Sequence, residues 1–183
     1  MAALAPRRSL KSRAIQLLAQ REHSRIELQR KLMAHARAEA HEARHALARP
    51  AGRDTGIADD AQAAARVGEV LDQLQAEGHL SAQRFVESRV NARQARFGNL
   101  RIRQELARHA LTLPAEARQA LNDSEVARAC DVLARKYSTP AQDAADRARR
   151  ARFLTGRGFS PDAVRQALRR SATDADAPYD SGD

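Results

Sequence analysis

The chain has 183 residues and a formal net charge of +9, and its cations are 29 Arg and only 3 Lys. It holds 40 Ala but only 33 Leu, Ile, Val and Phe residues, a share of large apolar residues below ~20%, which is typical of charged, disordered chains. No stretch is apolar enough to cross a membrane. Cys130 is the single cysteine, so an intrachain disulfide is excluded. We expect its thiol to be buried, and we expect the protein to be cytoplasmic.

Alanine is the strongest helix former, so the composition favours thin helical modules with small cores. The first predicted helix covers residues 9–20, and the second begins after Ser24, where Glu27 completes a capping box. Residues 36–60 are rich in Ala, Arg and His and interrupted by Pro and Gly, which indicates a partly helical insertion with a flexible end. A third helix is expected from about residue 60 to Ala76, closed by Gly78.

The next helices follow the same plan of short apolar stripes. We expect helices from Ser81 to near Gly98, from an Asn99 cap through Leu106, and from Pro114 to near Leu121. A further unit begins at residue 122 with an apolar stripe from Val126 to Tyr137. Its other two helices are predicted from 140 to about 155 and from 161 to about 170. Residues 171–183 are predicted to form an acidic, disordered tail.

Two segments in the second half of the chain have similar sequences. Residues 106–121 read LARHALTLPAEARQAL, and residues 154–168 read LTGRGFSPDAVRQAL. Such repetition indicates tandem modules that form an extended binding surface. The predicted fold is all-α, an elongated array of three three-helix repeats. These cover residues 1–80, with the 36–60 insertion, then 81–121 and 122–170.

Four ordered segments resemble the RecX family of regulatory proteins. Its opening motif is similar to REHSRIELQRKL at 21–32, and its central signature to VLDQLQAEGHLSAQRFVESRV at 70–90. The segment that follows is similar to FGNLRIRQEL at 97–106, and the closing motif to FLTGRGFSP at 153–161. The resemblance covers nearly the whole chain outside the insertion and the two ends, and the insertion departs from the family pattern.

The resemblance implies a non-enzymatic protein that binds the RecA recombinase filament in its helical groove. Such a protein restrains strand exchange, ATP hydrolysis and coprotease activity, in control of DNA repair and the SOS response. From this we expect a cytoplasmic monomer without cofactor, with the RecA filament as its partner and weak, sequence-independent DNA binding besides.

Positive charge recurs at the second helix of each predicted repeat. Arginine guanidinium groups suit carboxylates and phosphates alike, and charges on amphipathic helices are also often mere solvated faces. The recurrence favours a basic stripe that contacts the filament, DNA or both. Its candidate residues are Arg25, Arg30, Lys31, Arg84, Arg101, Arg103, Arg108, Arg149, Arg150, Arg152 and Arg157.

Other functions are less favoured by the sequence. His41-Glu42-Ala-Arg-His45 matches the zinc-protease pattern, but it lies in a segment without an apolar stripe or a third ligand, so we expect no catalytic or metal site. All aromatic residues except Tyr179 occupy apolar helical positions and are expected in cores, which disfavours base stacking. A helix-turn-helix DNA reader is the main alternative, although such a reader concentrates its cations on one recognition helix.

Overall fold

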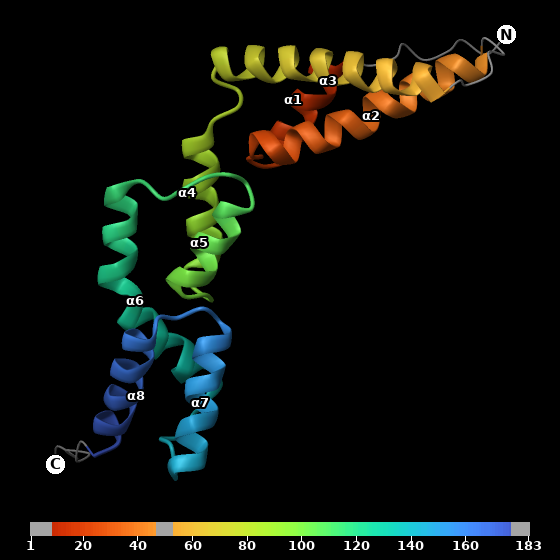
Figure 1. The fold of residues 1–183 in the computed structure, drawn as a ribbon. Coiled ribbons are helices and arrows are strands. Elements are labelled where there is room, and N and C mark those ends of the chain that lie inside the picture. Colours follow the sequence, from red (N-terminus) through yellow and green to blue (C-terminus); the bar gives the residue numbers. More distant parts are fainter. Residues whose placement is uncertain (1–8, 47–52, 177–183) are drawn as a thin grey trace, which may run out of the picture. The chain divides into compact units, whose positions relative to one another are not determined.

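The computed structural model describes residues 9–46 and 53–176. Within them the chain forms helices and no strands, which confirms the predicted all-α class. The helices, shown in Figure 1, are α1 (Leu10–Gln20), α2 (Arg25–Ala46), α3 (Arg53–Ala76), α4 (Ala82–Arg93), α5 (Asn99–Ala107), α6 (Ala115–Lys136), α7 (Ala144–Gly156) and α8 (Pro161–Asp176).

The chain divides into two compact units, Met1–Phe85 and Val86–Asp183. In the first unit, α2 and α3 run antiparallel, and α1 packs against both (Figure 1). Their core consists of leucine and alanine with Val67, and Leu28, Leu32, Leu71 and Leu74 are fully buried. These leucines recur at helical spacing, so each helix buries one stripe against its partners.

Local signals set the ends of these helices, as predicted for Ser24 and Gly78. The Ser9 hydroxyl accepts a hydrogen bond from the Ser12 amide at the start of α1. The Ser24 hydroxyl accepts one from the Glu27 amide at 3.1 Å at the start of α2. Gly78 adopts φ 74° after α3, a left-handed conformation that glycine tolerates best.

The insertion at 36–60 lengthens two helices of the first unit. Helix α2 continues to Ala46, and α3 begins at Arg53, earlier than the predicted residue 60. Ala36 and Ala63 are buried between the two helices, and Arg37 Nε lies 3.0 Å from Asp60 Oδ1. The helical part of that prediction is confirmed. The interruption predicted at Gly56 is wrong, because Gly56 lies within α3, and residues 47–52 lie outside the described residues.

In the second unit, α8 packs against α6 and α7 (Figure 1). The core there contains Val132, Leu133, Leu154, Phe159 and Val164. Cys130 lies beside this core and is half-buried, less enclosed than predicted.

Several predicted helix boundaries in this unit are wrong. No helix ends near Leu121, because α6 runs without interruption from Ala115 to Lys136 and joins the expected second and third repeats through one helix. The helix ending predicted near Gly98 comes at Arg93. Helix α7 begins after an Asp143 cap, not at Pro140, because the Asp143 carboxylate accepts the Asp146 amide at 2.7 Å.

The start of α5 and the end of α8 also differ from expectation. Gly98 occupies the N-cap position predicted for Asn99, whose side-chain amide instead donates to the Leu121 carbonyl. Helix α8 continues to Asp176, so residues 171–176 of the predicted disordered tail are helical. The rest of that tail lies outside the described residues.

Candidate anion-binding surface

Two loops cross at close range in the second unit, one before α5 and one before α8. The Gly98 amide donates to the Arg157 carbonyl, and the Leu100 amide donates to the Gly158 carbonyl, each at 3.0 Å. A Cβ at Gly98 would lie 2.2 Å from Phe159 Cα, and one at Gly158 would lie 2.5 Å from Arg101 Cβ. Both positions therefore require glycine for this approach, which brings Arg101 next to the end of α7.

A buried carboxylate from α6 holds both loops. Glu125 Oε1 accepts the Asn99 amide at 2.8 Å and the Ser160 amide at 3.2 Å, while Oε2 accepts the Ser160 hydroxyl at 2.7 Å. Amides at the starts of α5 and α8 lack intrahelical acceptors. One carboxylate thus satisfies donors at the start of two helices.

Arg128, one turn further along α6, fixes the α4–α5 loop. Burial lowers the pKa of Arg128 below its ordinary value, and the nearby Glu125 charge partly offsets this. Its guanidinium donates to four acceptors, namely the carbonyls of Gln94, Phe97 and Leu121 and the Asn99 side chain. The sequence pattern does not predict this role, since nothing local distinguishes Arg128 from the other arginines.

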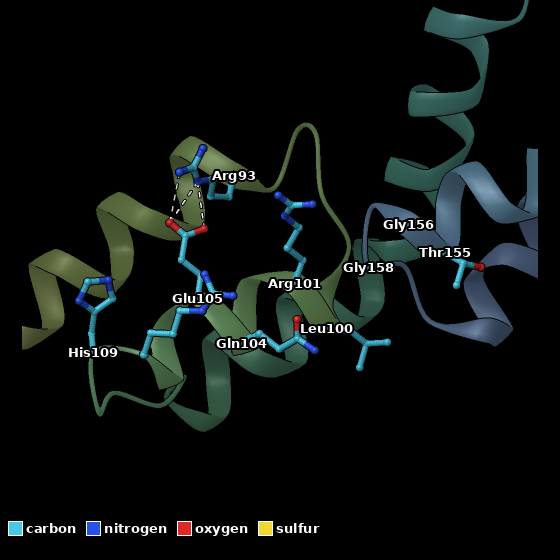
Figure 2. A pocket seen from close by; sticks show the side chains of 10 residues that line it. Arg93, Leu100, Arg101, Gln104, Glu105, His109, Thr155, Gly156 and Gly158 are labelled. Carbon is cyan, nitrogen blue, oxygen red and sulfur yellow. Dashed lines mark hydrogen bonds and ion pairs between the residues drawn. The ribbon is translucent and has the colours of Figure 1, made fainter.

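An open depression of about 610 Å³ lies beside this crossing. Figure 2 shows α5 side chains along one side and the end of α7 on the other. Its lining is mostly polar and carries three arginines against one carboxylate. The lining residues are Arg93, Leu100, Arg101, Gln104, Glu105, Arg108, His109, Thr155, Gly156 and Gly158.

The carboxylate in the depression is already neutralised. Arg93 Nε and Nη2 lie 3.1 Å and 3.2 Å from the Glu105 carboxylate oxygens (Figure 2), and Arg89 Nη1 lies 3.3 Å from Oε1. Such a forked pair is stronger than a single charged hydrogen bond. The remaining positive charge in the depression belongs to Arg101 and Arg108.

Three aromatic rings that the sequence placed in cores are half-buried and contact cations, although Tyr137 and Phe153 also pack against the core of this unit. The Arg101 guanidinium lies 4.4 Å from the Phe97 ring centroid, and Arg157 lies 4.6 Å from that of Phe153. Lys136 lies 4.7 Å from the Phe153 centroid, and the Phe153 and Tyr137 rings meet edge to face at 5.8 Å. Cation–π contact orients these side chains at the surface. The core prediction holds for Phe85 and Phe159, which are buried.

The four candidate cations of the first unit differ in their ion pairs and hydrogen bonds. Arg84 Nε binds Glu22 at 2.7 Å, and its Nη2 donates to two backbone carbonyls, so Arg84 stabilises the turn after α3. Arg25 Nη2 lies 2.7 Å from Asp72. Arg30 and Lys31 on α2 have no ion pair with any described residue. Of the four candidates in this unit, these last two have charge available to a partner.

The seven candidates of the second unit lie on α5, α7 and the residues that follow them. Arg101, Arg103 and Arg108 are exposed, and so are Arg149 and Arg152. Arg157 is half-buried over its aromatic rings. The structure thus brings Arg101 and Arg157 together around Phe97, which the sequence did not predict.

Arg150 does not fit the predicted role. It is only 4% exposed, its Nη2 binds Asp146 at 2.7 Å, and its Nη1 donates to the Thr139 carbonyl at 2.7 Å. The hydrogen bond from Arg150 lowers the pKa of Asp146. The side chain therefore stabilises the α6–α7 loop and is not part of the candidate surface.

The described residues contain neither a cluster of three metal-ligating side chains nor a helix that is long and apolar enough to span a membrane. His41 of the His-Glu-x-x-His pattern is exposed on α2, and the side chain of His45 lies outside the described part.

The fold and this surface define an all-helical protein with two compact units. The second unit carries a cationic surface whose arginines lie over aromatic rings. The model of the RecX third three-helix domain matches residues 123–168. The regulatory protein RecX of Leptothrix cholodnii is 43% identical over 92% of this chain and 93% of its own length. That of Herminiimonas arsenicoxydans is 41% identical over 92% and 96%, and one from Neisseria meningitidis is 31% identical over 91% and 93%. The chain belongs to the RecX family of regulatory proteins.

Proposed function

We propose that this chain binds the RecA recombinase filament and restrains its recombinase, ATPase and coprotease activities. In that role it would act in the control of DNA repair and the SOS response. Membership of the RecX family supports the proposal. The observation that carries it is the group of exposed arginines on and after α5, Arg101, Arg103 and Arg108, on a helix anchored by buried contacts.

The binding mechanism is electrostatic fit over several weak contacts. The first unit offers Arg30 and Lys31, and the second unit offers the α5 arginines with Arg149, Arg152 and Arg157. Each exposed ion pair contributes little alone. Linked modules that bind neighbouring sites of one filament raise the effective concentration of each contact and so the overall affinity. A chain bound in the filament groove would hinder entry of a second DNA.

We infer further that the protein acts in the cytoplasm as a monomer, without a cofactor or a catalytic step of its own. Direct DNA binding is expected to be weak and sequence-independent, because the available cations spread over several helices. The proposed boundaries of its three repeats remain 1–80, 81–121 and 122–170, with α6 shared by the second and third.

The test is co-sedimentation with RecA filaments assembled on single-stranded DNA, at two salt concentrations. Retention on filaments at low salt that weakens at high salt, and that exceeds retention on naked DNA, is expected. Protection of a defined operator sequence in a footprint would instead favour a helix-turn-helix DNA reader. Equal retention on naked DNA and on filaments would contradict the proposal.

A further inference from the structure

The depression beside α5 is lined by two unpaired arginines, Arg101 on that helix and Arg108 directly after it. Arg101 and Arg108 are seven residues apart, which corresponds to ~10.5 Å along a helix axis. Both line the depression and are exposed, and neither has an ion pair with any described residue. They form a pair of cations spaced for two separate negative groups.

On the opposite side, Gly156 is open to space while Gly158 lies directly against Arg101. Gly156 and Gly158 line this side together with Thr155 (Figure 2). A Cβ at Gly156 would meet no atom within 4 Å, so the space in front of it is empty of protein. The depression is thus bordered by two elements, α5 and the end of α7.

The chemistry of the site favours carboxylates on a peptide over a nucleic acid strand. Arg93 already binds the Glu105 carboxylate in a forked arrangement within the same depression. This pair shows a carboxylate bound by an arginine of the depression. The Phe97 ring carries the Arg101 guanidinium 4.4 Å from its centroid, which leaves this face closed to a stacked base.

We propose that the depression binds an acidic segment of a protein partner, with two carboxylates on Arg101 and Arg108. Gln104 contributes an amide that can hydrogen-bond to the peptide backbone. Phe97 acts as a positioning residue, because it holds the Arg101 guanidinium in place through cation–π contact. The inference rests on the proposed function for the partner's identity, but its test needs no RecA.

The experiment measures binding of fluorescein-labelled deca-glutamate to the full chain by fluorescence anisotropy. Arg101→Ala with Arg108→Ala should raise the Kd about fivefold or more. The matched control is Arg118→Ala with Arg147→Ala, two exposed arginines of α6 and α7 that do not line the depression. Gly156→Leu keeps every charge but fills the space, and should also weaken binding.

The outcomes separate this site from general charge attraction. Equal weakening in the two double variants, or full binding by Gly156→Leu at unchanged stability, would overturn the proposal. The proposal would also be overturned if the double variant of Arg101 and Arg108 bound a ten-nucleotide oligothymidylate more weakly than the wild type does but bound deca-glutamate equally well. If deca-glutamate behaves as expected while filament inhibition is unaffected, the site stands and the proposed function is what fails.

Discussion

The Glu125 carboxylate accepts the Ser160 hydroxyl at 2.7 Å, across 35 positions of sequence. Its other oxygen accepts the Asn99 amide, so one α6 side chain connects the start of α5 to the start of α8. The cationic depression borders this connection, since Gly158 and Leu100 line it. The geometry of the surface therefore depends on a buried residue that carries no surface charge.

Replacing Glu125 with Ala should destabilise the protein by about 2–4 kcal/mol, because it leaves buried donors unpaired. Glu125→Gln keeps an acceptor oxygen and should lose less. Urea unfolding followed by circular dichroism measures both. A loss within ~0.5 kcal/mol for Glu125→Ala would be typical of an ordinary surface position and would contradict this role.

The two crossing glycines should tolerate no side chain. Gly98→Ala would place Cβ 2.2 Å from the Phe159 backbone, and overpacking of that kind costs about 2–3 kcal/mol. Gly156→Ala is the matched control, because its Cβ would enter empty space. In the last turn of α7 it should be neutral or stabilise by up to ~1 kcal/mol. Thermal unfolding compares them, and equal stability of the two variants would refute the close approach.

Replacement of two α7 arginines that are two residues apart should affect the stability of the protein to very different extents. Arg150→Ala removes one partner of a buried ion pair and should cost about 3–5 kcal/mol. Arg152 is exposed, and its replacement by Ala should change stability by no more than ~0.5 kcal/mol. Chemical unfolding of both variants measures this. A stable Arg150→Ala variant would return this residue to the candidate surface.

His23 should make the first unit sensitive to mild acid. Burial, with the nearby Arg21 charge, lowers the pKa of His23 below 6.5, while Glu27 partly opposes the shift. Below pH 6.5 the unfolded chain therefore binds a proton that the folded chain does not, and stability falls with pH towards the folded pKa, by at most ~1.4 kcal/mol per pH unit.

Urea unfolding at pH 7.5 and pH 5.5 measures this dependence in the wild type and in His23→Asn. The variant should show a smaller difference between the two pH values, whatever its absolute stability. The same difference in both proteins would show that another group is responsible.

The sequence predicts what is local and misses what is formed by distant residues. Ser24, Gly78 and the leucine stripes act through neighbours a few positions away, and their roles were predicted correctly. The pattern at Asn122 and Glu125 resembles a helix start, but Glu125 is used to cap α5 and α8 from within α6. Tertiary partners of this kind cannot be read from spacing.

The candidate surface shows the same division. Exposed Arg101, Arg103 and Arg108 were predicted from charge recurrence, whereas Arg150 has the same charge and spacing but is buried by Asp146 and the α6–α7 loop. Phe97 lies at an apolar position, yet its ring supports cations from both α5 and the end of α7. Burial decides between these roles, and burial depends on the folded arrangement.

The most direct test of the account is inhibition of RecA. RecA ATP hydrolysis on single-stranded DNA is measured at increasing concentrations of the wild type. The same titration is made with a variant in which Arg101, Arg103 and Arg108 are replaced by Ala. A control variant replaces three other exposed arginines, Arg118, Arg147 and Arg165. We predict that the α5 variant needs a roughly tenfold higher concentration for half inhibition, and that the control inhibits like the wild type. Unchanged inhibition by an α5 variant of unchanged stability would contradict the claim that this surface binds the filament.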